Sequence, residues 1–284
     1  MPEMEHIKLG EHVFSVLADG PEQGAPVLLL HGFPVTGWMW RAPVERLAGA
    51  GFRAIAPDQR GYSQGARPTA TDDYATEKLT GDALAIMDHI GARQFHLVGH
   101  DWGGQLSWLI AAQAPERLLS LTVLSRPHPA AFARAMAEDK EQANRSRHHR
   151  AFREADAIER MRAAKLEPLR RAMIEQGVPE ADAEKYVRVL LEPGAIEGAM
   201  SWYRASNIAA ASVPAVRVPT LFVWGDRDAT VGRQAAELTK DYVDAPYRFE
   251  EIAGAGHFLV EEFPERVSEL IVDHVRTHAK ANAK

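Results

Sequence analysis

The stretch QFHLVGHDWGG, from Gln94 to Gly104, decides the fold class of this 284-residue chain. Its first half is an apolar run typical of a buried strand, and a helical pattern follows it up to about Ala114. A sharp turn between a strand and a helix lifts the side chain at its tip above the sheet edge, and small glycines clear space around it. The tip here is Asp101. The alternative is that Asp101 only caps the helix.

Strand-like runs alternate with helical patterns on both sides of this turn. Strands are predicted over 12–19, 26–32, 52–58, 94–99 and 118–125, and helices over about 41–50 and 76–90. This alternation predicts an α/β fold, with a mostly parallel sheet flanked by helices on both faces.

The strand signal stops between about Pro127 and Val216, where charged, alanine-rich helical stretches replace it. It returns over 220–226 and 247–254, before a closing helix over about 263–279. We therefore predict an α/β core made of residues 1–126 and 217–284. Residues 127–216 are predicted to form a helical cap, inserted after the strand over 118–125.

The composition excludes several classes of protein. The net charge of −6 gives no reason to expect nucleic acid or an anionic membrane as a partner. The chain has no cysteine, so it has no disulfide and no thiolate site. Its first residues do not resemble a signal peptide, and no apolar run approaches the roughly 20 residues of a membrane span. A cytoplasmic protein is expected, and the oligomeric state stays open.

Two later loops supply partners for Asp101. The strand before WGDRD places Asp226 and Asp228 at its end, and the last strand is followed by GAGHF with His257. Nucleophile, acid and histidine, each after a strand, follow the chain order of an α/β-hydrolase triad. Asp228 is the preferred partner of His257, because Asp226 follows its strand directly and is better placed to tighten the turn.

Backbone N–H groups are expected to form an oxyanion hole beside Asp101. The candidates are Trp102, directly after the nucleophile, and Phe33, which follows the strand that ends in LLL. Pro34 restricts the backbone of Phe33, which helps to fix its N–H.

An aspartate nucleophile changes the chemistry that can be expected. A carboxylate that attacks an ester or amide would give an anhydride, which is an uphill product. Attack on an sp³ carbon that bears a leaving group gives an alkyl ester, which water activated by His257 can hydrolyse. Epoxides and haloalkanes are the two substrate classes that fit. An epoxide oxygen needs a proton donor, whereas a halide needs only N–H donors.

The sequence resembles the α/β-hydrolase-fold epoxide hydrolases over nearly its whole length. Their motifs are matched in order by HGFPVTGWMW, DQRGYSQGARP, GHDWGG, PERLLSLTVLSRPHP, EPGAIEGAMSWYRA, WGDRD and GHF. The resemblance implies the α/β-hydrolase fold and a hydrolase of ether bonds (EC 3.3.2), which opens an epoxide to a vicinal diol without a metal or cofactor. Haloalkane dehalogenases share the core but typically differ at Phe33 and lack the WYR stretch.

In that family two cap tyrosines hold the epoxide oxygen. One of them matches Tyr203, for which the alternative is a core aromatic beside Trp202. The other has no tyrosine in this chain, and His148 falls on its place with His149 as its neighbour. The resemblance therefore implies His148 as a second donor, while the alternative is a solvated basic helix face in RSRHHR.

The remaining expectations concern the pocket and the rival functions. Trp38, His149 and Phe258 are expected to line a pocket for a small, apolar, epoxide-type substrate. One rival is a haloalkane or haloacid dehalogenase with the same triad. GHDWGG lacks the arginines that fluoroacetate enzymes place after the nucleophile. A further rival is a ligand-binding protein without catalytic activity.

Overall fold

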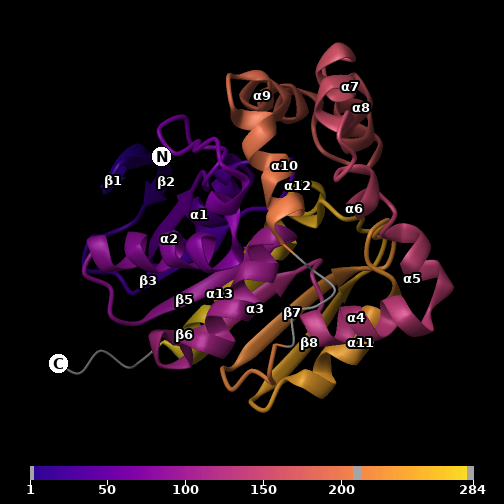
Figure 1. Ribbon diagram of the computed structural model, residues 1–284. Coiled ribbons are helices and arrows are strands. Elements are labelled where there is room, and N and C mark those ends of the chain that lie inside the picture. Colours follow the sequence, from indigo (N-terminus) through magenta and orange to yellow (C-terminus); the bar gives the residue numbers. More distant parts are fainter. Residues whose placement is uncertain (1–2, 207–212, 280–284) are drawn as a thin grey trace.

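Eight strands form one sheet in the order β1-β2-β4-β3-β5-β6-β7-β8 in the computed structural model, which describes residues 3–206 and 213–279 (Figure 1). The strands are β1 Glu3–Leu9, β2 His12–Asp19, β3 Pro26–Leu30, β4 Arg53–Pro57, β5 Phe95–His100, β6 Leu118–Leu124, β7 Thr220–Gly225 and β8 Tyr247–Ile252. At one edge of the sheet, β1 pairs with β2 and β2 pairs with β4, both in antiparallel orientation. All further neighbours in the sheet, from β4 through to β8, pair in parallel orientation.

Two pairs of helices flank the sheet. Helix α1 packs against α13 and the sheet, while α2 packs against α3, which lies along β5 and β6. Their bounds are α1 Arg41–Gly49, α2 Thr76–His89, α3 Trp102–Gln113 and α13 Pro264–His278. The predicted fold class is confirmed, and each predicted strand lies within two residues of an observed one. Only β1 escaped prediction, because just one of its seven residues, Ile7, is buried.

Seven helices lie in the described residues between β6 and β7, namely 125–206 and 213–219. They are α4 Pro129–Glu138, α5 Lys140–Arg145, α6 His148–Ala151, α7 Ala157–Ala163, α8 Glu167–Glu175, α9 Glu180–Leu191 and α10 Ala195–Ala205. Helices α7 to α9 stand at the top of the view, away from the sheet, while α4 packs against α11 (Arg233–Leu238) beside the sheet (Figure 1). The division into core and cap at 127 and 216 stays a prediction.

The carboxyl ends of the parallel strands share one edge of the sheet, as they must. Phe33 follows β3, Asp101 follows β5, Asp228 follows β7 and His257 follows β8. The fold thus gathers the predicted chemistry at one place. Among the described residues, no helix is long and apolar enough to span a bilayer.

Candidate active site

Asp101 stands on a strained turn between β5 and α3. Its backbone has φ 50° and ψ −118°, a conformation that L-residues rarely adopt and that costs on the order of 1–3 kcal/mol. The turn lies so close to β3 that a Cβ on Gly103 would fall 2.0 Å from the carbonyl oxygen of Leu30. Although Asp101 occupies the N-cap position, its side chain makes no capping hydrogen bond. Its carboxylate is directed to other groups.

One carboxylate oxygen of Asp101 lies at the expected oxyanion hole. The Phe33 N–H donates to Asp101 Oδ1 over 2.9 Å, and the peptide bond between Phe33 and Pro34 is cis. Trp102 is the first residue of α3, where backbone N–H groups have no partner within the helix and the helix dipole is positive. The Phe33 N–H therefore contacts the carboxylate, while the Trp102 N–H, on the next residue, stays the second expected donor.

His257 lies between two carboxylates. Its Nδ1 is 3.1 Å from both Oδ1 and Oδ2 of Asp228, and its Nε2 is 3.7 Å from Asp101 Oδ2. Asp228 is almost fully buried, whereas Asp226 is exposed and accepts a hydrogen bond from the Gly254 N–H. The structure thus brings Asp101, Asp228 and His257 together and leaves Asp226 to the turn.

Thr230 belongs to the same cluster, although no sequence pattern predicted it. Its backbone N–H and its hydroxyl both donate to Asp228 Oδ1, over 2.8 Å and 2.7 Å, and the Val231 N–H adds a third donor at 3.0 Å. The Thr230 hydroxyl oxygen also lies 2.6 Å from His257 Nδ1. The loop therefore fixes the carboxylate of Asp228, which in turn orients the imidazole.

The charges of His257, Asp101 and Asp228 shift one another's pKa values. Burial alone would lower the pKa of His257, but the carboxylates of Asp228 and Asp101 raise it to about 10. Burial raises the pKa of Asp101, yet the contact with His257 outweighs it and holds that pKa well below its usual range. Burial also opposes ionisation of Asp228, and His257 and Thr230 still lower its pKa. Both carboxylates are thus ionised and His257 is protonated at neutral pH.

Helix α5 braces the loop that carries Asp228. Gln142 is fully buried, and its side chain accepts from the Gly232 N–H over 2.8 Å and donates to the Thr230 carbonyl over 2.8 Å. Arg145 donates to the backbone carbonyl of Asp228. These contacts join residues about 90 positions apart, so no sequence pattern could have revealed them.

Tyr203 lies on α10 and faces the nucleophile turn. It is buried, and its ring centroid is 5.7 Å from that of Phe33 and 5.1 Å from that of Trp102, edge to face in both cases. Burial and the negative charge of Asp101 raise the pKa of Tyr203 well above its usual value. The phenol therefore keeps its proton and is a permanent hydrogen-bond donor.

The two adjacent histidines differ in what they can donate. His148 Nδ1 is 3.1 Å from the Arg145 carbonyl, which only accepts, so Nδ1 carries the proton and neutral His148 has no N–H at Nε2. Burial lowers the pKa of His148, which keeps the ring neutral at pH 7. His149 lies edge to face with Tyr203 at 5.5 Å, and burial lowers its pKa to about 3. In this arrangement His148 can donate from Nε2 only as an imidazolium.

The other two expected pocket residues, Phe258 and Trp38, have different neighbours. The Phe258 ring is 5.2 Å from that of His257. The Trp38 indole donates to Asp182 on α9 over 2.8 Å, and the Lys185 ammonium lies 3.2 Å from the ring centroid. Trp38 thus ties α9 to the core, and none of the ring contacts in the described residues joins it to the site.

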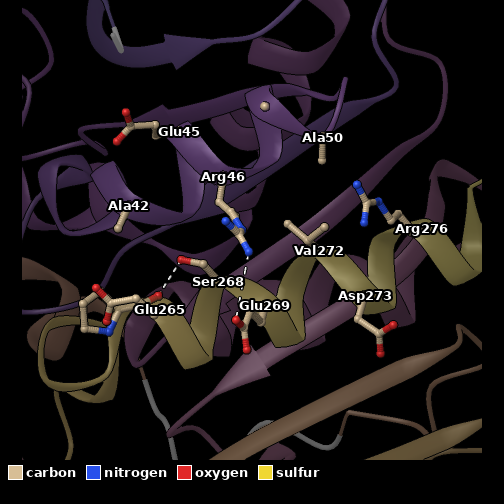
Figure 2. Close-up of a pocket in the computed structure, with 12 residues that line it drawn as sticks. Ala42, Glu45, Arg46, Ala50, Glu265, Ser268, Glu269, Val272, Asp273 and Arg276 are labelled. Atoms are coloured by element: carbon tan, nitrogen blue, oxygen red, sulfur yellow. Dashed lines mark hydrogen bonds and ion pairs between the residues drawn. The ribbon is translucent and has the colours of Figure 1, made fainter.

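A hollow of about 760 Å³ lies elsewhere, between α1 and α13. Figure 2 shows side chains of both charges around it, and Arg46 and Glu269 form an ion pair across it at 4.0 Å. It contains no histidine and none of the residues gathered around Asp101. We regard it as a solvated groove between two amphipathic helices.

Comparisons with known proteins agree with this geometry. Residues 25–264 match the family model of the alpha/beta hydrolase fold. The chain is 33% identical over 273 residues to mouse epoxide hydrolase 4, covering 91% of this chain and 75% of that protein. A solved structure described as one of the novel epoxide hydrolases from metagenomes of hot environments is 26% identical, with a TM-score of 0.88, and covers 98% of this chain and 99% of that one.

A further structure, the Bacillus megaterium epoxide hydrolase in complex with an inhibitor, has a TM-score of 0.87 at 23% identity and covers 96% of this chain and all of that one. At that identity it supports the fold alone. The match to the family model and the 33% identity to the mouse relative show the family as well as the fold. The chain belongs to the α/β-hydrolase-fold epoxide hydrolases.

Proposed function

We propose that this protein hydrolyses epoxides to vicinal diols through an alkyl ester on Asp101. The observation that carries the proposal is an ionised carboxylate on a strained turn, placed between the Phe33 N–H and His257. Tyr203 contributes a phenol that stays protonated on the facing side. The epoxide hydrolases among its relatives support the substrate class.

The first step forms the ester. An oxygen of Asp101 attacks one ring carbon, the C–O bond of the epoxide breaks, and its electron pair goes to the ring oxygen. That oxygen takes a proton from Tyr203. Because alkylation removes the negative charge of Asp101, the pKa of His257 falls. His257 then gives up a proton while Tyr203 regains one.

The second step hydrolyses the ester. Neutral His257 takes a proton from water, and the hydroxide attacks the carbonyl carbon of the ester. The oxyanion that develops is stabilised by the N–H groups of Phe33 and Trp102. The intermediate collapses, the leaving alkoxide takes the remaining proton of the attacking water, and Asp101 is ionised again. One oxygen of the diol therefore comes from the carboxylate of Asp101, and an oxygen of water takes its place in that carboxylate.

The isotope balance gives a direct test. A single turnover of styrene oxide in H₂¹⁸O, with enzyme in excess, should give unlabelled diol and place ¹⁸O in the peptide that contains Asp101. Repeated turnovers should give labelled diol. Labelled diol in the first turnover would mean direct attack by water. Halide release from 1-chlorobutane without any turnover of epoxides would support the dehalogenase instead.

Replacing Tyr203 by phenylalanine is expected to lower the rate of ester formation by roughly 10²-fold, because the leaving oxygen loses its proton donor. Stopped-flow or rapid-quench kinetics with styrene oxide would measure this step. Tyr186→Phe is the matched control, since Tyr186 is also a buried cap tyrosine but donates to Glu261. Equal rates in the two variants would remove Tyr203 from the mechanism.

A cytoplasmic location and a small, apolar, epoxide-type substrate were expected from the sequence; the location remains a proposal, and the epoxide hydrolases among the relatives support the epoxide class of the substrate.

A further inference from the structure

Arg126 is a buried cation that forms no ion pair with a carboxylate in the part of the chain that the structure describes. It follows β6 in SRPHP and is 5% exposed. Its Nε and Nη2 both donate to one neutral acceptor, Gln105 Oε1, over 3.0 Å and 2.8 Å. It forms no ion pair with any Asp or Glu in the described residues, and the remaining positions of the chain contain no Asp or Glu. Its Nη1 has no hydrogen-bond partner among the described residues.

Such an arrangement is costly. A buried charge is normally paired, because only a close counterion and good hydrogen bonds offset the free-energy cost of removing it from water. The chain nevertheless makes room for this one. A Cβ on Gly104 would lie 2.8 Å from the Cβ of Arg126, so the last glycine of GHDWGG accommodates the stem of the arginine. The guanidinium carbon then lies 4.5 Å from the ring centroid of Phe132.

The surroundings of Arg126 are those of the active site. Phe132 stacks on His149 at 6.4 Å, and His149 contacts Tyr203 at 5.5 Å. Gln105, which holds the guanidinium, lies one turn after Asp101 and donates its N–H to the Asp101 carbonyl over 2.9 Å. The positive charge of Arg126 also acts on both Asp101 and Tyr203. Contacts through Gln105 on one side, and through Phe132 and His149 on the other, therefore connect the cation to the nucleophile and to the phenol.

We infer that Arg126 binds a carboxylate on the substrate, so that the preferred epoxides carry an anionic group. The inference rests on the proposed function for the reaction and adds the substrate class. An arginine presents several N–H donors in a plane that fits a carboxylate, and Nη1 is available for this contact. The substrate anion would supply the missing counterion of Arg126. It would also place the neutral ring carbon, rather than the anion, next to Asp101.

Matched pairs of substrates test the inference. Glycidate and glycidamide differ only in a carboxylate against an amide beside the ring, and 4-(oxiran-2-yl)benzoate and its amide repeat the comparison at a longer spacing. In at least one pair, kcat/KM is expected to favour the carboxylate by roughly 10- to 100-fold in the wild type, the usual effect of a hydrogen bond to a charged group. Arg126→Gln should bring this ratio close to one, and Arg126→Lys should retain part of it.

Arg134→Gln is the control variant. Arg134 lies on α4 near Phe132, but it is exposed and pairs with Glu138 at 3.1 Å, so its loss should leave the preference for carboxylates intact. Hydrolysis of styrene oxide without a preference for the carboxylate in either pair would overturn the inference and leave the proposed function standing. A preference that survives in Arg126→Gln would overturn it as well.

A binding measurement on the wild type can support the anion site even if the proposed reaction fails. Calorimetry should show tighter binding of phenylacetate than of phenylacetamide, and this measurement does not depend on turnover. Tighter binding of the anion in a protein that hydrolyses no epoxide would support the anion site while the proposed reaction fails. Equal binding of the two compounds would count against Arg126 as an anion site.

Discussion

Replacing His257 by glutamine is expected to leave the alkyl ester on Asp101. Ester formation needs the carboxylate, whereas ester hydrolysis needs a base, and His257 is the group held by Asp228 for that purpose. Loss of a general base typically slows its step by roughly 10²- to 10⁴-fold. Intact-mass measurements after mixing with styrene oxide should show a gain of one epoxide per chain, and peptide mapping should place it on Asp101.

The double variant His257→Gln, Asp101→Ala is the control, and it should gain no mass. The wild type offers a second measurement. Since ester hydrolysis requires neutral His257, the ester should accumulate as the pH falls through the pKa of His257 in the intermediate. That pKa lies below the value of about 10 in the free enzyme, because the charge of Asp101 has gone. A fraction of ester that does not change with pH, or label on another residue, would contradict the assignment.

Replacing Asp101 by alanine is expected to abolish diol formation, with a loss of at least about 10⁴-fold in kcat/KM. The variant removes the only carboxylate that accepts from the Phe33 N–H in the described residues. Diol formation would be followed by chromatography, and circular dichroism would verify the fold.

Asp226→Ala is the matched control for Asp101→Ala. Asp226 is an acid of the same sheet edge, but it binds the Gly254 N–H and does not touch His257. Its activity should stay close to that of the wild type. Equal diol yields from Asp101→Ala and the wild type would mean that Asp101 is not the nucleophile.

The core of the fold was predictable because its signals are local. An apolar run, the GHDWGG turn and a helical pattern specify strand, turn and helix within about 20 residues, and the same pattern recurs along the chain. Strand β1 was missed because an edge strand with one buried side chain lacks that signal. Asp228 could be preferred over Asp226 because it lies two residues further into the loop. In the structure Asp228 is the one that contacts His257.

The environment of the site could not be predicted in the same way. Thr230 looks like an ordinary loop residue until its hydroxyl is seen between Asp228 and His257. His148 was expected to offer an N–H to the substrate, but the Arg145 carbonyl fixes its proton on the other nitrogen. Trp38 stays a predicted pocket residue, and its indole N–H is directed to Asp182 on α9.

The sequence by itself determined the α/β fold, the order of Asp101, Asp228 and His257, and the class of reaction that a carboxylate nucleophile can start. It could do so because parallel strands bring their carboxyl ends to one edge, so that chain order alone implies proximity. Only the tertiary structure decided which groups surround those residues. Burial and charge act between side chains far apart in the chain. Arg126 in SRPHP therefore becomes informative only when it is found buried, held by an amide and without an ion pair to any carboxylate of the described residues.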